Sequence, residues 1–489
     1  MGTQVATILG QTPLNGNTSD LVHPSLTEGV QFGIFISNGD EGGGLDGTLS
    51  SVGIWARDSN QLCQASFGQD DAPRTDIING HVDRNDAVAF RSTLVDGEAS
   101  RVRAFVDQPI SNGVRIASVV HNAAPRNIPI GAMLFAGDDV KAQVHQVQVS
   151  RVVGQTTLVN PEIDGLSVDM IVALTSTDIF NGSTHGGFTN QTVSFHTFVD
   201  EVKQSSVAQT IAWRSSNNAN AFAPHAIASG LVTANGNHVQ SDPSRHPDLA
   251  APWEFSIDVV DGLIRIETIR AGDENSDPEF GLLVAHLGGD RATAGLMSTP
   301  ATTPAGTVNA AFSPSIDSNL KGLLLQLNNV STVGVDLIDS PMAGHYGMAM
   351  ISSAPASDRF SSQSSWDADA EPTSALTTQG DFLSVQSDDG SLAVVGEANI
   401  VDNNLSVAFT DSQTFHFPFL AIVEGPPEPD PDPNDNDDDA TDSDLETRLT
   451  SIEQTLAELA ACPKPIVEDP DNPGEFVICL LYTSPSPRD

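Results

Sequence analysis

The sequence predicts an all-β protein made of three tandem antiparallel β-sandwich modules. Short apolar and alternating runs are separated by Gly, Pro, Asn and Asp, which is typical of strands joined by turns. A hairpin signal recurs three times along the chain, and no sustained 3.6-residue apolar period occurs before residue 440. A parallel α/β fold would need amphipathic helices between its strands, and the sequence shows none.

The stretch 259–266 carries the clearest hairpin signal. Asp261-Gly262 separates two apolar arms, and this dipeptide tolerates the positive φ that a type I′ turn needs at both central positions. Similar hairpins are predicted at 105–116 and 400–407. One such hairpin in each third of the chain indicates three copies of one β unit.

The order of the predicted elements is the same in each copy. A strand is followed by a Gly-rich loop, a segment running from Gln to an aromatic residue, the hairpin and a closing apolar strand. A unit of roughly 140–150 residues is too long for a solenoid repeat and fits a self-sufficient jelly-roll or Ig-like sandwich, repeated like beads. The predicted modules are residues 1–138, 139–290 and 291–424.

The matched aromatic residues are Phe67, Trp213 and Trp366. Aromatic side chains can stack on sugars, and they also fill β-sandwich cores. Recurrence at one position of a repeated module favours packing in the core. Trp55 and Trp253 have no such match, so either is open to the alternative of an exposed contact.

The composition changes after residue 424. Residues 425–442 are rich in Pro and Asp, which predicts a disordered acidic linker. In 443–461 a capping box begins a short heptad helix whose apolar seam is Leu445, Leu449, Ile452, Leu456 and Leu459. Two heptads are marginal alone, so we expect self-association, with a trimer as one option, and a lone amphipathic helix as the alternative. A tail follows at 462–478, and 479–489 resemble a translated sequencing adapter foreign to the native chain.

Four carboxylates in this region form the clearest candidate metal site in the sequence. Asp435, Asp437, Asp439 and Glu446 have the spacing of positions 1, 3, 5 and 12 of a Ca²⁺-binding loop. The pattern departs from that loop at Ala440, where the turn glycine is expected, and at Asp442. An Asp-rich linker also produces this spacing by chance, and the alternative is that these residues bind no metal. Ca²⁺ is the only cofactor that the sequence suggests.

The charge of the chain is strongly unbalanced. There are 64 Asp and Glu residues against 21 Lys and Arg, a formal charge of −43. Such a surface repels phosphate backbones and anionic membranes, so a nucleic-acid partner is not expected. High solubility explains the acidity, and so does life in concentrated salt, which screens self-repulsion. The start at 1–9 lacks the features of a signal peptide, so we expect synthesis in the cytoplasm and no membrane insertion.

Sequence motifs of common enzymes are missing. No Lys follows a Gly, no His directly precedes a Glu, and no nucleophile elbow is present. The 12 histidines are scattered, and strand or loop packing explains each of them well, His196 among them. A triad assembled by the fold has no fixed spacing, so the sequence does not test for one. We therefore expect a protein without enzymatic activity.

The order of strand, Gly loop, Gln-to-aromatic segment, hairpin and closing strand resembles tandem β modules of bacteriophage and prophage virion proteins. The stretches 281–314 and 392–423 carry the resemblance best. Proteins of this kind form tail fibres, tail-associated parts or head decorations. The resemblance implies a virion structural or host-surface-binding protein, whose partners are other virion proteins or a host glycan. It carries over no site residue.

Two other classes of function are compatible with the sequence. A secreted or cell-surface adhesin of lectin-like type would share the β modules but should carry an export signal. A polysaccharide-degrading enzyme on a β scaffold should place two carboxylates roughly 5–9.5 Å apart in a groove. The sequence shows no export signal, and it does not display the distance between two carboxylates.

Overall fold

The structure is a computed structural model that divides into two compact units, Met1–Pro426 and Pro427–Asp489. Side chains are described for fewer residues than the backbone, mainly those of the packed strands. All regular secondary structure in the described residues is β-strand, which confirms the predicted all-β fold. The backbone is described for residues 2–13, 16–37, 48–67, 78–84, 88–95, 98–121, 129–176, 188–216, 219–222, 225–229, 232–235, 252–271, 278–298, 306–309, 311–316, 318–328, 334–338, 343–367, 373–375, 383–386, 392–396, 398–401, 404–409, 416–425, 466–468 and 476–478.

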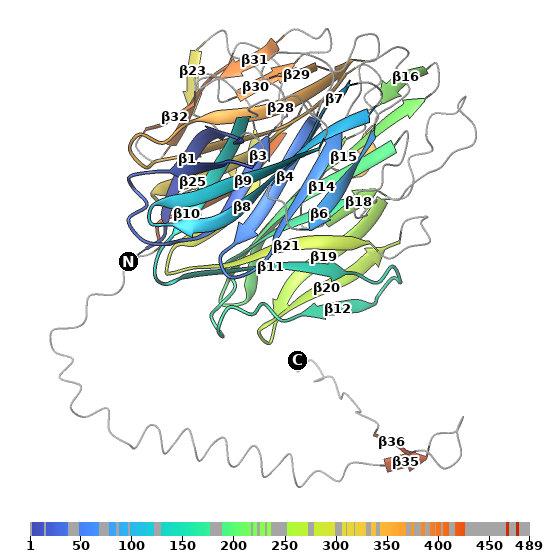
Figure 1. Ribbon diagram of the computed structural model, residues 1–489. Helices are drawn as coiled ribbons and strands as arrows, with labels where there is room; N and C mark the ends of the chain where they lie inside the picture. The colour runs from blue at the N-terminus through green and yellow to red at the C-terminus, as the bar shows by residue number, and fades with distance from the viewer. Residues whose placement is uncertain are drawn as a thin grey trace, which may run out of the picture. The chain divides into compact units, whose positions relative to one another are not determined.

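The first repeat contains β1 to β10 and forms a two-sheet sandwich (Figure 1). Its large sheet has the order β1-β10-β3-β4-β5-β6, and its small sheet has the order β2-β9-β8-β7. The strands are β1 Gln4–Gln11, β2 Thr18–Val22, β3 Val30–Ser37, β4 Thr48–Ala56, β5 Gln61–Phe67, β6 Ile78–Arg84, β7 Val88–Val95, β8 Glu98–Ile110, β9 Gly113–His121 and β10 Pro129–Ala136.

The second repeat contains β11 to β21 and has the same arrangement. Its large sheet begins β11-β21-β13-β14-β15-β17, and its small sheet is β12-β20-β19-β18. The strands are β11 Val140–Gln148, β12 Thr156–Val159, β13 Met170–Ser176, β14 Phe188–Val199, β15 Val202–Ser216, β16 Ala219–Phe222, β17 His225–Ser229, β18 Val232–Asn235, β19 Pro252–Val260, β20 Leu263–Arg270 and β21 Glu279–Leu287.

The third repeat contains β22 to β34. Its large sheet is β24-β22-β34-β25-β27-β28-β29, and β23-β33-β32 and β30-β31 form smaller sheets. β26 leaves this repeat and pairs with β17 of the second. The strands are β22 Arg291–Ser298, β23 Gly306–Asn309, β24 Ala311–Ser313, β25 Leu320–Asn328, β26 Gly334–Ile338, β27 Ala343–Ser352, β28 Phe360–Asp367, β29 Thr373–Ala375, β30 Leu383–Gln386, β31 Leu392–Gly396, β32 Ala398–Val401, β33 Asn404–Phe409 and β34 His416–Val423. In the second unit β35 Ile466–Glu468 pairs with β36 Phe476–Ile478.

One topology underlies all three repeats. The first strand pairs with the last, and the last pairs with the strand that begins an antiparallel meander, which is β3, β13 or β25. The second strand crosses to the small sheet, where it pairs with the penultimate strand, as in a jelly roll. The predicted central hairpin is confirmed, because Val260 pairs with Leu263 and φ is 52° at Asp261 and 73° at Gly262.

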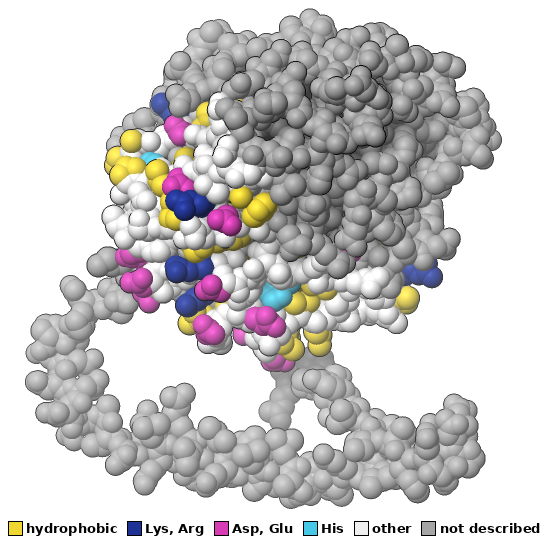
Figure 2. Space-filling view, viewed as in Figure 1, with side chains coloured by type: hydrophobic (Ala, Val, Ile, Leu, Met, Phe, Trp, Pro, Cys, Tyr) yellow, Lys and Arg dark blue, Asp and Glu magenta, His cyan; other side chains and the backbone are white. Residues whose placement is uncertain are grey.

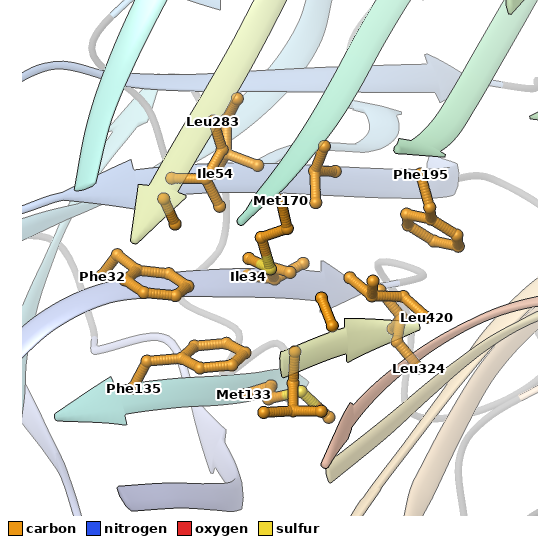
Figure 3. Packing of buried hydrophobic residues seen from close by; sticks show 14 of the residues in the cluster. Phe32, Ile34, Ile54, Met133, Phe135, Met170, Phe195, Leu283, Leu324 and Leu420 are labelled. Atoms are coloured by element: carbon orange, nitrogen blue, oxygen red, sulfur yellow. The ribbon is translucent and has the colours of Figure 1, made fainter. Parts of the chain in front are cut away.

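The large sheets are buried on both faces. Each repeat has a core of its own, which in the first and second repeats lies between the two sheets, and one further cluster contains residues of all three repeats. Figure 3 shows this common core, with Ile34 and Met133 of the first repeat near Met170 of the second and Leu324 of the third. Two-sided burial explains the uninterrupted apolar runs in these strands, since both alternating sets of side chains face a core.

The expectation of separate beads is therefore wrong, because the sandwiches share a core within one compact unit. A repeated hydrogen bond shows how they meet. Thr7, Val144 and Ala294 occupy one position of the first strand, opposite Met133, Leu283 and Leu420 respectively. Their backbone N–H groups donate to Ser352, Ser59 and Ser205 Oγ at 3.2, 3.0 and 3.1 Å.

Each of these serines belongs to one hairpin of a neighbouring repeat, which is β4–β5 for Ser59, β14–β15 for Ser205 and β27–β28 for Ser352. The second repeat thus packs against the first, the third against the second, and the first against the third. Equivalent close contacts follow the same order. A Cβ atom added to Gly281 of the second repeat would meet Leu62 of the first, and one added to Gly131 of the first would meet Phe360 of the third. The three sandwiches form a closed ring.

The ring closes at a buried carboxylate. Asp290, 5% exposed, lies between the second and third repeats. Its Oδ2 accepts hydrogen bonds from Thr3 N at 2.5 Å and Lys321 Nζ at 2.7 Å, and its Oδ1 accepts one from Gly425 N at 3.2 Å. One side chain therefore holds the first strand, the third repeat and the end of the unit together.

The serine contacts lead to a first prediction. Replacing Ser59, Ser205 or Ser352 by Ala leaves a buried or half-buried N–H without its acceptor, so each change should lower the free energy of unfolding by about 1–2 kcal/mol. Denaturant unfolding in molar salt measures this loss. Ser111→Ala, in the exposed β8–β9 turn, is the control and should change stability by less than about 0.5 kcal/mol. Equal effects at all four serines would contradict the assigned role.

Candidate functional site at the tip of the second repeat

An open hollow of about 700 Å³ lies at one tip of the second repeat. Three segments form it: the loop between β12 and β13, the β14–β15 turn, and the β19–β20 turn that the sequence singled out. The lining residues are Asn160, Pro161, Glu162, Ile163, Asp164, Gly165, Leu166, Ser167, Asp200, Glu201 and Gly262. Four of them are carboxylates, so the hollow is acidic.

Much of the hollow is built from left-handed backbone. The φ angles are 55° at Glu162, 59° at Asp164, 49° at Asp200 and 63° at Glu201, and Asp261 beside them has 52°. Asp visits this region more readily than most residues, while Glu does so rarely. The turns therefore depend on strongly paired strands below them, which force the chain to reverse over two residues.

Contacts with the core fix the loop between β12 and β13. Glu162 N donates to Asn160 Oδ1 at 3.1 Å, and Pro161 O contacts His145 Nε2 at 3.1 Å. Ile163 is 2% exposed and anchors the middle of the loop in the core of the second repeat. The upper surface of the loop is consequently held in place while its acidic side chains remain exposed.

A histidine–carboxylate pair supports the end of this loop. His286 Nδ1 lies 3.0 Å from Asp169 Oδ2 and 3.0 Å from Ser167 O. The hydrogen bond with Asp169 raises the pKa of His286, against the opposing effect of its partial burial. Asp169 Oδ2 also accepts a hydrogen bond from Leu287 N at 2.7 Å, which ties the loop to β21. The pair is a structural support for the hollow.

The chemistry of the hollow follows from its side chains. Glu162, Asp164, Asp200 and Glu201 offer carboxylate oxygens, which accept hydrogen bonds from the hydroxyl groups of sugars and attract ammonium groups. Exposed hydrophobic side chains occur in or next to the same segments. Leu166, Val202 and Val260 are 39%, 62% and 43% exposed. Figure 2 shows acidic and hydrophobic side chains interspersed on the lower part of the visible described surface. The arrangement suits binding of a polar molecule with some apolar surface.

His196 lies in the same repeat but is closed to substrates. Its ring is fully buried, with Ser206 Oγ 2.6 Å from Nδ1 and Ser194 Oγ 3.0 Å from Nε2. Burial lowers the pKa of His196 to about 3, and the positive charge of Lys203 adds to this effect. The imidazole is therefore a neutral core residue held between two hydroxyls, in agreement with the packing role expected from the sequence.

The predicted calcium ligands Asp435, Asp437, Asp439 and Glu446 lie outside the described residues, as do the linker 425–442 beyond Gly425 and the heptad helix 443–461. Within the described part of the chain, no group of three or more His, Cys, Asp or Glu residues is arranged to hold a metal ion. The side chains of Phe67, Trp213 and Trp366 are also outside the described set. Their backbones occupy one position, opposite Thr48 on β4, Thr189 on β14 and Gly344 on β27.

The sequence did not predict the hollow, although it predicted the β19–β20 turn that forms one side of it. The Asp261-Gly262 turn was predicted as a hairpin and not as part of a surface site. The loop 160–167 carries a signal in hindsight, because Asn-Pro-Glu-Ile-Asp-Gly places acidic residues and turn formers around a single apolar anchor. The turn at Asp200-Glu201 lies far from this loop in sequence, so only the fold brings them together.

No protein-family model matches the sequence, and a search of curated proteins finds no match. Among the described residues, no helix has the length and apolar character needed to cross a membrane. The ring of sandwiches and the hollow at its tip are therefore the observations on which a function can rest.

Proposed function

We propose that the chain is a non-enzymatic structural or host-surface-binding protein of a virus particle, of the tail fibre, appendage or decoration type. The observation that carries the proposal is the closed ring of three sandwiches around one core. Such a ring gives a single chain the rigidity that separate modules would obtain only by assembling. A protein exposed on a particle needs this property, because it has to survive outside the cell.

The surface of the ring supports a binding role. Both faces of the large sheets are covered by packing, so the turns and loops at the sandwich tips provide the irregular surface on which ligand sites are usually built. The acidic hollow of the second repeat is such a surface. A host glycan, with hydroxyl groups along its chain, is the class of ligand that suits it best.

The first test asks whether the chain belongs to particles. Virus particles from the source culture should be purified by density gradient in molar salt and analysed by mass spectrometry beside the cell-envelope fraction. We expect the chain in the particle fraction, in a fixed ratio to the major capsid protein. Recovery in the envelope fraction alone would overturn the proposal in favour of an adhesin.

The second test asks what the hollow binds. The full chain should be screened on immobilised surface glycans in molar salt, beside the variant Asp200→Asn/Glu201→Gln, which keeps the shape of the turn and removes two charges. We expect at least about tenfold weaker glycan binding by the variant with an unchanged melting temperature, since hydrogen bonds to charged groups contribute about 1.5–3 kcal/mol each. Asp107→Asn, which removes an exposed carboxylate on β8 of the first repeat, is the control. Shortening of the glycan would favour a depolymerase.

A further inference from the structure

Among the side chains that the structure describes, the exposed hydrophobic ones are concentrated on the second repeat. Of the eight large ones that the described residues expose, only Val22 belongs to the first repeat. Four others lie on β12, on β20 and in the loop before β12. Their exposed fractions are 51% for Val152 and 57% for Val153 in the loop, 60% for Leu158 on β12 and 41% for Ile269 on β20. We call the outer surface formed by these four residues the β12 face.

The loop that carries the two valines is firmly held. Gly154 N donates to Thr268 O at 2.8 Å, and Thr268 N donates to Gln155 O at 3.1 Å, so the loop extends the pairing of β12 along β20. This places Val153 beside the end of β20, where Ile269 is exposed. Hydrophobic side chains on a rigid surface lose little conformational entropy when a partner binds, which favours a docking role.

The first repeat shows that folding does not require this exposure. Strand β2 is its equivalent of β12, and Asp20 pairs with Arg115 there, as Leu158 pairs with Arg265 in the second repeat. Asp20 Oδ1 accepts a hydrogen bond from Arg115 Nε at 2.7 Å, and Oδ2 accepts one from Nη2 at 3.0 Å. The same position thus holds an ion pair in one repeat and a 60% exposed leucine in the other.

The charges around the β12 face are balanced, although the chain has a net charge of −43. Each carboxylate of the small sheet has a basic partner: Glu267 has Arg265 at 2.6 Å, Asp258 has Lys203 at 2.6 Å, and Glu254 has Arg270 at 3.1 Å. Two copies of so acidic a chain repel each other at most points of approach. If they approach through this face, the carboxylates of the two small sheets are already paired with basic side chains.

We infer that the β12 face is the contact between two copies of this chain. β12 ends its sheet and pairs only with β20 among the described strands, so its second edge presents backbone N–H and C=O groups. A second copy turned by a half rotation presents the same groups in complementary order, and the two β12 strands pair antiparallel. The two Leu158 side chains then lie on the same side of the joined sheet and bury each other.

The test measures association of the full chain in molar salt by sedimentation equilibrium, together with amide hydrogen exchange of residues 156–159 over a range of concentrations. We expect exchange at these residues to slow as the concentration rises. Leu158→Asp should remove that effect and raise the dissociation constant at least about 100-fold, because each dimer loses two buried leucines and gains two facing carboxylates. Exchange at β12 reports this contact separately from any association through 443–461.

The variant carries its own control for folding. The carboxylate introduced by Leu158→Asp would face Arg265 as Asp20 faces Arg115, so the melting temperature of the dilute protein should not fall. Leu158→Thr is a milder second variant and should weaken association about tenfold. Val22→Asp, on the equivalent strand of the first repeat, should leave association unchanged. Exchange of 156–159 that is independent of concentration in the unaltered chain, or unchanged association of Leu158→Asp, would overturn the inference.

Discussion

Replacing Asp290 by Ala should destabilise the compact unit more than any other single change considered for this chain. The change leaves Lys321 Nζ, Thr3 N and Gly425 N without their common acceptor at a position where the Asp side chain is only 4% exposed. Breaking a buried ion pair by removing one partner costs about 3–5 kcal/mol. Denaturant unfolding in molar salt, followed by tryptophan fluorescence, measures the loss.

Two further variants separate this junction from a general effect of lost charge. Asp58→Asn removes a carboxylate charge that is 92% exposed and keeps a residue that tolerates the φ of 57° at this position, so it should change stability by less than about 0.5 kcal/mol. The double variant Asp290→Asn/Lys321→Met removes both charges together, so it should recover part of the loss. A double variant that is less stable than Asp290→Ala would argue against an ion pair as the main contribution.

Acid should unfold the protein in a way that depends on His196. Its pKa is about 3 in the folded state, below the ordinary value of 6.5, so between these values only the unfolded chain binds the proton. The contribution of neutral His196 to the free energy of unfolding is fully present above about pH 6.5 and is lost as the pH falls towards 3. This difference between the two pKa values corresponds to a loss of about 5 kcal/mol at most in the free energy of unfolding.

His196→Gln should flatten the fall in stability between pH 6.5 and 3, even though it lowers stability at neutral pH by loosening the core. The measurement is a series of denaturation curves across this pH range for both proteins. An unchanged slope for His196→Gln would show that His196 is protonated in the folded protein or that other groups dominate.

His286 should act in the opposite direction. Its raised pKa stabilises the folded state below the ordinary value of 6.5, and this contribution is lost as the pH rises through the raised value. The two histidines of one repeat therefore respond to acid with opposite signs. The steepest acid sensitivity is expected where the contribution of His286 is complete and that of His196 is being lost.

Local features of the fold could be predicted from the sequence because they depend on neighbouring residues. The turn at Asp261-Gly262 needs two residues with positive φ, and the dipeptide supplies them. The apolar strands were also found, but their common core was not. A run such as Leu323-Leu324-Leu325 shows that both faces are buried without showing what covers each face.

The candidate site was less predictable for the same reason. Asp164, Asp200 and Gly262 come from three separate connections, and their meeting depends on the pairing of strands that lie far apart in sequence. The spacing of Asp435, Asp437 and Asp439 drew attention to the linker, because a local pattern is the only kind of site that a single sequence displays. The calcium site there stays a prediction.

The closed ring has a consequence for the order of the repeats along the chain. A ring has no first member, and Asp290 holds Thr3 and Gly425 at the same junction, so the two ends of the ring are neighbours. A circular permutant that begins with β11, continues through β34 into a short linker and then into β1 would make every contact of the original. The order of the three repeats is set by where the gene starts, and the contacts between the sandwiches do not depend on that order.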